Sequence, residues 1–344
     1  MTVLITGGAG FIGSNFIHEW FCKNNEKLIN LDLLTYSANL SNLKEFKNDS
    51  RYVFINGNIN DKSLVSNIFA KYQPRLVINF AAESHVDRSI NNPSIFIETN
   101  VLGTLNLLEC ALNFYNNKEY VKKDDFIFLH ISTDEVFGEI NLNDPPFDED
   151  SKYFPNSPYS ASKASSDHLV RSFNVTYNLP TIITNCSNNF GPYQSVDKFI
   201  PLVINRAIKQ KNIPIYGNGL NVRDWLYVSD HCSALIEIII NGKTGQTYNI
   251  GAQNERNNNE VVFTICDLLD ELIPISGKDK KSYKELIKYV KDRPGHDKRY
   301  AVNSNKLRHE TNWAPEIDFS NGIRKTIEWY LNNQKWVKDS EKKL

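Results

Sequence analysis

The chain has 344 residues, 41% of them hydrophobic and 23% charged, and a formal net charge of -1 at pH 7. This length and apolar content suffice for one large or two closely packed domains with a substantial core. The nearly balanced charge provides no basic field that would attract nucleic acid or an anionic membrane, so neither is expected as a partner. An anionic ligand would need a local pocket.

Cysteine and histidine patterns argue against disulfides and metals. The five cysteines are odd in number, form no C-x-x-C pair and fall in apolar or helical-looking stretches. We therefore expect buried free thiols in a reducing compartment and no metal site. The chain opens without a signal-peptide pattern, and its most apolar run, 234–240, is too short to span a membrane. A cytoplasmic protein is the expectation.

Short apolar runs alternate with longer amphipathic stretches through the first half. Because the strands are apolar on both sides and alternate with helices, the pattern predicts an α/β fold with a Rossmann-type doubly wound parallel sheet. The predicted strands are 3–6, 28–32, 52–56, 76–80, 126–132 and 181–185, and the predicted helices between them are 11–22, 62–72, 95–115 and 158–177.

The pattern loosens after about residue 188. Polar and aromatic residues dominate up to 227, and the polar stretch 253–259 is expected to be a surface loop that meets a ligand at a strand end. We expect a Rossmann domain over 1–187, with a return segment near 229–252, and a smaller α/β substrate-binding domain over 188–228 and 253–344. Further predicted elements are helices 230–241, 260–272 and 321–333, strand 247–250, and a solvated charged tail over 335–344.

A glycine fingerprint follows the first predicted strand. Gly8-x-Gly10-x-x-Gly13 stands between a strand and a helix, where glycines let backbone amides approach a pyrophosphate and the helix N-terminus favours its charge. Asp32 ends the second strand nineteen residues after Gly13. A carboxylate there accepts hydrogen bonds from both ribose hydroxyls and repels a 2′-phosphate, so NAD is predicted rather than NADP. The alternative for Asp32 is a surface turn.

Tyr159 and Lys163 lie one turn apart on the predicted helix 158–177. A free tyrosine has a pKa of about 10, and a neighbouring ammonium group favours the phenolate. Tyr159 would then remove a hydroxyl proton while hydride leaves for NAD. The alternative is an exposed pair on an amphipathic helix, since one such spacing is expected by chance among 16 tyrosines.

Thr133-Asp134-Glu135 ends the strand 126–132, at the edge where open parallel sheets bind ligands. An acid and a second base beside Tyr159 would allow water to be expelled from an oxidised sugar. The alternative is a helix N-cap, because Thr or Asp before Glu is a common start signal. The residues alone leave both interpretations open.

Over residues 2–333 the chain resembles the extended short-chain dehydrogenase/reductases, and among them the dTDP-glucose 4,6-dehydratases. The glycine, Ala-Ala and Tyr/Lys segments are shared with sugar-nucleotide epimerases, whereas Thr-Asp-Glu, Ser-His-Val-Asp-Arg-Ser and Arg-Pro-Gly-His-Asp point to the dehydratases. The matching segments are 5–15, 81–89, 132–138, 158–164, 188–193, 221–225 and 292–297.

The resemblance implies a mechanism for converting dTDP-glucose to dTDP-4-keto-6-deoxyglucose in deoxysugar (rhamnose-type) biosynthesis. Tyr159 would deprotonate the C4 hydroxyl as hydride passes from C4 to NAD, with Thr133 hydrogen-bonded near that oxygen. Glu135 would then take the C5 proton, and Asp134, kept protonated by its neighbouring carboxylate, would donate to the departing C6 hydroxyl. Hydride returns to C6, so tightly bound NAD is regenerated at each turnover. Lys163 would also hold the nicotinamide ribose.

The same resemblance implies two sets of binding residues and a homodimer that pairs through the helices 95–115 and 158–177. Arg223 and Arg293 would clamp the diphosphate; the alternative for them is a surface charge, and for Phe199, Pro214 and Ile215 it is core filling. The cofactor set is Gly7, Gly10, Phe11, Ile12, Gly13, Asp32, Leu33, Leu34, Thr35, Asn58, Ile59, Phe80, Ala81, Ala82, Ser84, Thr99, Tyr159, Lys163 and Asn189. The substrate set is Ser84, Thr133, Asn188, Lys198, Phe199, Pro214, Ile215, Tyr216, Arg223, Asn258, Arg293, His296 and Tyr300.

The chain departs from the family pattern at the adenosine end of the expected site. Asn58 stands where the family often has Asp, and Leu33 where it tends to have Lys. Asp87 and Arg88 are expected to shape their loop through a local ion pair. Two alternative functions remain: a UDP-glucose 4,6-dehydratase or UDP-sugar 4-epimerase, and an NAD-binding sensor or scaffold without turnover.

Overall fold

A seven-stranded sheet forms the centre of the computed structural model, which describes residues 1–117, 125–275 and 281–344. Its strands run in the order β10-β6-β5-β4-β1-β2-β3, and every neighbouring pair is parallel. The predicted fold class is therefore confirmed. The strands are β1 (Thr2–Thr6), β2 (Lys27–Asp32), β3 (Tyr52–Asn56), β4 (Leu76–Asn79), β5 (Ile127–Thr133), β6 (Thr181–Cys186) and β10 (Thr247–Ile250).

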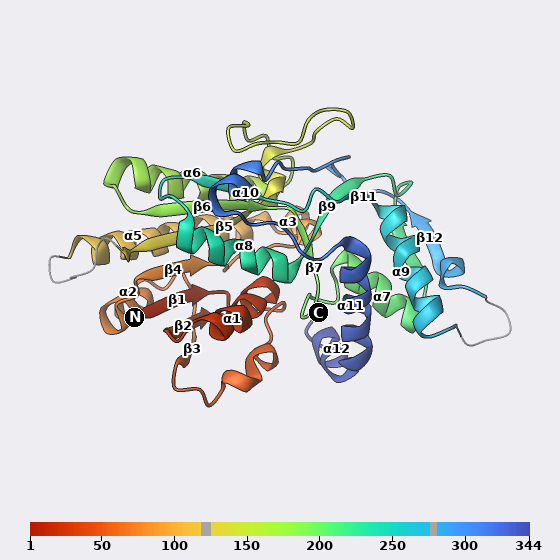
Figure 1. Ribbon diagram of the computed structural model, residues 1–344, viewed down its shortest axis with the longest axis horizontal. Coiled ribbons are helices and arrows are strands. Elements are labelled where there is room, and N and C mark those ends of the chain that lie inside the picture. Colours follow the sequence, from red (N-terminus) through yellow and green to blue (C-terminus); the bar gives the residue numbers. More distant parts are fainter. Residues whose placement is uncertain (118–124, 276–280) are drawn as a thin grey trace.

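Helices cover both faces of this sheet (Figure 1). Residues of α1 and α8 share one apolar cluster with alternate strand residues, and residues of α2, α5 and α6 share a second cluster with the strand residues between them. Two buried faces explain why the strands read as continuous apolar runs. The helices are α1 (Phe11–Lys23), α2 (Lys62–Tyr72), α5 (Gly103–Asn116), α6 (Pro158–Tyr177) and α8 (Val228–Asn241).

The predicted helix 95–115 is not uniformly α-helical. It begins as α4 (Pro93–Phe96), passes through the π-helical segment η2 (Ile97–Leu102) and continues as α5. Within η2, buried Asn100 accepts a hydrogen bond from Glu83 N and donates to Glu83 O and Ser162 Oγ. The π turn therefore fastens the loop after β4 to α6. By length and composition the helical run 93–116 could cross a membrane. However, half of the apolar 18-residue stretch within it that meets this criterion is buried inside the fold.

A second lobe stands beside the sheet, with its own apolar core (Figure 1). Two small sheets, β11-β9-β7 and β12-β8, and three longer helices build it. Its elements are β7 (Asn188–Phe190), β8 (Ile213–Tyr216), β9 (Val222–Tyr227), β11 (Glu255–Asn257), β12 (Ile287–Val290), α7 (Phe199–Ile208), α9 (Asn258–Leu272) and α11 (Phe319–Asn332). Further short helices of the described residues are η1 (Leu40–Phe46), α3 (Val86–Asn91), η4 (Asp134–Phe137), η5 (Tyr283–Leu286), α10 (Asn305–Thr311) and α12 (Gln334–Glu341).

Two predicted irregular segments are ordered elements instead. The expected loop 253–259 contains β11, which pairs antiparallel with β9, and Asn257 then caps α9. The expected solvated tail 335–344 contains α12, whose Val337 is only 1% exposed. Pairing with β9 orders the first stretch despite its polarity. Burial of the Val337 side chain does the same for the second. Cys22 is exposed, contrary to the expectation of buried thiols. The other four cysteines are buried as expected, and all five are free.

The helix α12 ties the end of the chain to its beginning. Trp336 Nε1 donates to Asn42 Oδ1 at 2.7 Å, and Lys343 Nζ donates to Ala38 O at 2.9 Å. Asn42 in turn donates to Ala9 O in the glycine turn.

Candidate active site

A cavity of about 420 Å³ opens at the carboxyl ends of the parallel strands. It brings together most of the predicted cofactor residues and all five predicted catalytic residues. Those lining it are Gly7, Gly10, Phe11, Ile12, Gly13, Asp32, Leu33, Thr35, Asn58, Ile59, Phe80, Ala81, Ala82, Ser84, Thr99, Thr133, Asp134, Glu135, Tyr159, Lys163, Asn188, Asn189 and Lys198. The predicted residues outside its lining are Leu34, Phe199, Pro214, Ile215, Tyr216, Arg223, Asn258, Arg293, His296 and Tyr300.

Backbone geometry shapes the glycine turn between β1 and α1. Gly7 has φ +70°, and a Cβ there would lie 2.6 Å from Ala81 N. A Cβ on Gly13 would lie 2.5 Å from Gly7 O, a contact that side chains essentially never make. Only glycine therefore allows the turn, the neighbouring strand and the helix start to pack this closely.

Asp32 is held at the end of β2 by two backbone amides. Its Oδ2 accepts a hydrogen bond from Ala9 N at 2.9 Å, and its Oδ1 accepts one from Leu34 N at 2.8 Å. Leu34 itself adopts a left-handed backbone conformation, with φ +58°. Each carboxylate oxygen keeps a lone pair for a further donor. Burial raises the pKa of Asp32, while the two amide bonds lower it.

Thr133 caps a short helix, as one interpretation of the Thr133-Asp134-Glu135 run predicted, and all three residues also line the cavity. Thr133 caps η4, its Oγ1 accepting from Glu135 N at 3.3 Å, and it also donates to Asp134 Oδ1 at 3.3 Å. Asp134 is 2% exposed, and its Oδ2 has no hydrogen-bond partner among the described residues. Burial, followed by the neighbouring Glu135 and Asp224, raises the pKa of Asp134 well above its ordinary value.

Glu135 faces more positive charge than Asp134. Burial raises its pKa, but the cations Arg293, Arg223 and Lys198 all lower it, in that order. Adjacent carboxyl groups with different charged neighbours can hold different protonation states, one as acid and one as base.

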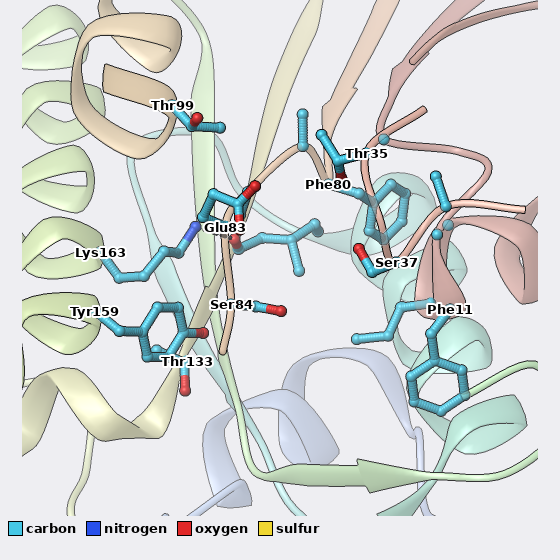
Figure 2. Close-up of a pocket in the computed structure, with 18 of the residues that line it drawn as sticks. Phe11, Thr35, Ser37, Phe80, Glu83, Ser84, Thr99, Thr133, Tyr159 and Lys163 are labelled. Atoms are coloured by element: carbon cyan, nitrogen blue, oxygen red, sulfur yellow. Dashed lines mark hydrogen bonds between the residues drawn. The ribbon is translucent and has the colours of Figure 1, made fainter. Parts of the chain in front are cut away.

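Tyr159 and Lys163 project from the first turns of α6 into the cavity, with Thr133 beside the tyrosine (Figure 2). A capping box between Ser157 and Ser160 fixes this end of the helix. Burial and then Glu135 raise the pKa of Tyr159 well above 10, and the hydrogen bond with Thr133 lowers it. Lys163 Nζ donates to Ile131 O at 2.7 Å, and burial lowers its pKa.

Lys163 and the positive nicotinamide ring were expected to favour the phenolate together, and Lys163 is not among the main influences on the Tyr159 pKa. Its ammonium group is held by the Ile131 carbonyl, and the charge that acts most strongly on Tyr159 is the negative one of Glu135. Sequence reasoning placed Tyr159, Lys163 and Glu135 in one site, but it did not predict that Glu135 raises the Tyr159 pKa.

Of the two predicted phosphate-binding arginines, Arg223 is buried and Arg293 is half-buried. Arg223 is buried and donates to Asp297 O and Val222 O, and it stacks on Tyr300 with its guanidinium 4.2 Å from the ring centre. Arg293 pairs with Asp87 at 3.2 Å, and its buried Nε has no hydrogen-bond partner among the described residues. The expected Asp87–Arg88 pair is therefore replaced by a long-range one.

Arg88 instead stacks over the Tyr36 ring at 3.6 Å. A flat guanidinium favours such a stack, which local sequence spacing does not reveal.

The other predicted substrate residues lie at different depths. Lys198 Nζ donates to Ser84 O at 2.8 Å, and Asn188 Oδ1 is buried without a partner among the described residues. Ile215 is fully buried in the core of the second lobe, which was the alternative weighed for it. The Phe199 ring stacks on Trp225, and the Tyr216 ring meets His296 edge-on while its hydroxyl donates to Asp87. Asn258 N donates to Asn221 O, and the Tyr300 hydroxyl donates to Asp297. Pro214 is half-buried in β8.

Sequence reasoning missed several residues of the cavity wall. Glu83 is buried, and burial raises its pKa. The signal was present, because Glu83 lies inside the matching segment 81–89. Gln194, whose buried Oε1 has no partner among the described residues, directly follows the segment 188–193. The other missed lining residues are Leu31, Ser37, Ala38, Gly57, Asn60, Ile95, Glu98, Ile131, Ser132, Cys186, Ser187 and Ser195.

Comparisons with known proteins agree with this geometry. Residues 4–326 match the model of the GDP-mannose 4,6 dehydratase family. A dTDP-glucose 4,6-dehydratase from Shigella flexneri is 52% identical over 347 residues, which span 98% of this chain and 95% of that protein. The Bacillus anthracis dTDP-glucose 4,6-dehydratase, solved in complex with NAD, has a TM-score of 0.86 and 41% identity, covering 99% of each chain.

DesIV, the dTDP-glucose 4,6-dehydratase from Streptomyces venezuelae solved with NAD and TYD bound, has a TM-score of 0.89 and 38% identity. The match covers 99% of this chain and 100% of that one. The chain belongs to the GDP-mannose 4,6 dehydratase family, and its relatives within that family at about half identity are dTDP-glucose 4,6-dehydratases.

Proposed function

We propose that the chain is an NAD-dependent dTDP-glucose 4,6-dehydratase, which releases water and forms dTDP-4-keto-6-deoxyglucose for deoxysugar biosynthesis. The observation that carries this proposal is the single cavity that holds Asp134, Glu135 and Tyr159 together with a glycine turn. Its homologues at 52% identity support the same activity.

The residues at the glycine turn fit NAD. Gly7 and Gly13 leave room for a pyrophosphate where any Cβ would intrude, and Asp32 keeps acceptor capacity for ribose hydroxyls. Leu33 and Asn58, both in the cavity wall, make the adenosine end less charged than the family pattern. When bound, NAD supplies a hydride acceptor for C4 and returns that hydride to C6.

Tyr159 and Thr133 act at the C4 oxygen. The positive nicotinamide ring would favour the phenolate form of Tyr159, against the burial that raises its pKa. That phenolate takes the proton of the C4 hydroxyl as hydride leaves C4, and the Thr133 hydroxyl holds that oxygen in place. Lys163 lies one turn further along α6, where its three N–H donors serve the Ile131 carbonyl and the nicotinamide ribose.

Asp134 and Glu135 divide the elimination between them. Oxidation at C4 acidifies the C5 proton, which the Glu135 carboxylate removes. Asp134 stays protonated because burial and adjacent negative charge raise its pKa, and it donates that proton to the C6 oxygen, which departs as water. Glu135 then returns a proton to C5.

The diphosphate is proposed to lie between the two lobes. Arg293 supports this placement, because its Nε is a buried donor without a partner among the described residues. Lys198 and Asn188 provide further polar atoms at the same end of the cavity. Arg223, which is committed to backbone carbonyls, contributes chiefly its charge. The other predicted substrate residues outside the lining complete the proposed pocket for the base and sugar.

A substrate panel tests the activity. The purified protein is mixed with dTDP-glucose or UDP-glucose, and the product is followed by mass spectrometry. Loss of one water from the dTDP sugar supports the proposal. Water loss only from the UDP sugar would identify a UDP-glucose dehydratase, unchanged mass with galactose configuration an epimerase, and no reaction a non-catalytic NAD-binding protein.

We also propose a homodimer that pairs through the face formed by η2 and α6. Ile97 and Leu102 in η2 and Val175 and Tyr177 at the end of α6 are all exposed apolar side chains. Burying them against a second copy removes apolar area from water. Light scattering tests this proposal, since Leu102→Glu is expected to yield monomers.

We also propose a cellular location for the protein and a division of the chain into two domains. The first is a cytoplasmic location, supported by five free cysteines, which suit a reducing compartment. The second is a division into an NAD-binding domain (1–187 with 229–252) and a sugar-nucleotide domain (188–228 with 253–344). Separate apolar cores support this division, although Leu307 of α10 packs with the sheet. Limited proteolysis would test the boundaries.

A further inference from the structure

Helix α6 carries a third buried polar side chain on the face that bears Tyr159 and Lys163. This residue is Asp167, one further turn along the helix, where residues four apart lie one above the other. Tyr159 and Lys163 line the active-site cavity, whereas Asp167 lies outside its lining. Asp167 is 1% exposed, and burying a carboxyl group is costly unless its oxygens are satisfied. Asp167 has no part in the proposed chemistry, so its place in the fold calls for another explanation.

Asp167 receives hydrogen bonds from three other segments of the chain. Its Oδ2 accepts from Ser132 Oγ of β5 at 2.8 Å and from Asn185 Nδ2 of β6 at 3.2 Å. The Tyr153 hydroxyl, from the segment before α6, donates to the same oxygen at 3.1 Å. An ionised carboxyl group only accepts hydrogen bonds, so it suits a position that three donors approach. Asp167 therefore joins α6 to β5 and β6.

The other oxygen of Asp167 faces a neutral histidine. His130 Nε2 lies 3.4 Å from Asp167 Oδ1. Burial lowers the pKa of His130 to about 4, so the ring is uncharged at neutral pH. Its Nδ1 faces the donor Asn79 Nδ2 at 3.2 Å, which leaves the single ring proton on Nε2. Donors thus face both oxygens of Asp167, an arrangement that fits a carboxylate and does not fit an amide.

Asn185 extends the contacts of Asp167 to the proposed catalytic residues. Its Nδ2 donates to Thr133 O at 3.2 Å as well as to Asp167. Thr133 is the last residue of β5 and leads directly into η4, which begins with the two proposed catalytic carboxyl groups. The phenol and the ammonium group come from α6 instead, and Figure 2 shows the Tyr159 ring beside Thr133. Two separate elements must therefore meet at one hexose.

We propose that Asp167 is a positioning residue, which fixes α6 against the end of β5 so that both halves of the catalytic set reach the same sugar. This inference rests on the proposed function, in which Tyr159 and Thr133 act at the C4 oxygen and Glu135 acts at C5. A displacement of about 1 Å can slow a reaction by about 100-fold. The spacing between α6 and β5 therefore governs the rate, whereas the proposed diphosphate contacts lie elsewhere.

The variant Asp167→Asn tests this role. It keeps the size of the side chain but turns an NH2 group toward the His130 N–H or toward the three donors at Oδ2. We expect kcat for water loss, per bound NAD, to fall by about 10- to 100-fold, while calorimetry shows unaltered affinity for dTDP. The control is Asp270→Asn, at a half-buried carboxylate that accepts from Ser282 and Tyr283 N outside the cavity. It is expected to lower the free energy of unfolding and leave kcat unaltered.

A double-mutant cycle tests whether Asp167 acts through Asn185. Because both side chains belong to one set of contacts, we expect Asp167→Asn with Asn185→Ala to lose less activity than the product of the two single losses. A loss equal to that product would overturn the shared route, and an unaltered kcat in Asp167→Asn would overturn the positioning role. A role in stability alone would not produce either expected result.

Two milder variants serve if Asp167→Asn does not fold. Tyr153→Phe and Ser132→Ala each remove one donor and keep the carboxylate, and each is expected to lower kcat by a smaller factor with dTDP affinity unaltered. Unaltered kcat in both would overturn the proposal. Failure of the proposed function is distinguishable, because the unaltered protein would then release no water from dTDP-glucose.

Discussion

The cofactor end and the hexose end of the cavity are built by different means. The glycine turn relies on backbone: Gly7 and Gly13 leave space, and Asp32 is fixed by two amides. The hexose end relies on buried side chains, of which Asp134 and Arg293 keep atoms without hydrogen-bond partners among the described residues. In the proposed mechanism, backbone shape thus prepares binding at one end, whereas buried polar atoms without partners among the described residues prepare chemistry at the other.

The largest expected effect isolates the chemistry of the hexose end. Glu135→Gln removes the base for the C5 proton, so kcat for water loss is expected to fall by about 100- to 10,000-fold. Transfer of deuterium from C4 to bound NAD should remain detectable, because that step uses Tyr159. The matched control is Glu139→Gln, four residues on and exposed. Dehydration by Glu135→Gln at the unaltered rate would contradict the assignment.

The next effect concerns recognition of the diphosphate. Arg293→Gln removes a charged donor, and hydrogen bonds to charged groups contribute about 1.5–3 kcal/mol. We therefore expect dTDP to bind roughly 10- to 100-fold more weakly in calorimetry, with bound NAD unchanged. Arg324→Gln, at a half-buried arginine paired with Glu271, is the control. Equal affinities for both variants would place the diphosphate elsewhere.

A pair of glycine substitutions tests whether shape governs the cofactor end. In Gly13→Ala the new Cβ would meet backbone atoms at 2.5 and 2.8 Å, whereas in Gly10→Ala it would meet only Gly7 O at 3.2 Å. We expect Gly13→Ala to lower the free energy of unfolding by about 1–3 kcal/mol and to lose NAD. Denaturant titration and cofactor absorbance measure both. If Gly10→Ala destabilised the protein as much, close packing would not be the cause.

The smallest effect is a pH dependence of stability. Because burial raises the pKa of Asp134 in the folded state, the unfolded chain releases this proton first as pH rises. The stability that Asp134 contributes is thus fully present below a pH of about 4 and is lost as pH rises through its folded pKa.

Asp134→Asn removes this loss. We expect its unfolding free energy to fall less steeply with pH, by up to about 1.4 kcal/mol per pH unit. Urea titrations at several pH values measure the slope, and exposed Asp150→Asn is the control. Parallel slopes for Asp134→Asn and the unaltered protein would show that Asp134 is ionised when folded.

Local sequence patterns predicted the sheet and the glycine turn well. Buried parallel strands are short apolar runs, and the turn after β1 requires glycine at fixed spacing, so both leave a local signal. The boundaries of β3, α2, α6 and β10 match the structure without any shift.

What could not be predicted depends on partners distant in sequence. The Arg293–Asp87 pair joins residues 206 positions apart, and β11 becomes a strand only because β9 lies beside it. The sequence placed Glu135 in one site with Tyr159 but did not give its effect on the Tyr159 pKa, and Glu83 joins the cavity wall only through the fold. Spacing along one helix carries no information about such neighbours.

The contacts of α12 couple the last residues to the dinucleotide site. Asn42 bonds both Trp336 and the carbonyl of Ala9, whose own amide bonds Asp32. A dinucleotide that stabilises this turn therefore also stabilises the docking of α12. Because such coupling is reciprocal, the docked helix increases the affinity for the dinucleotide. Trimming the chain before Trp336 is accordingly expected to show itself first as faster escape of the cofactor.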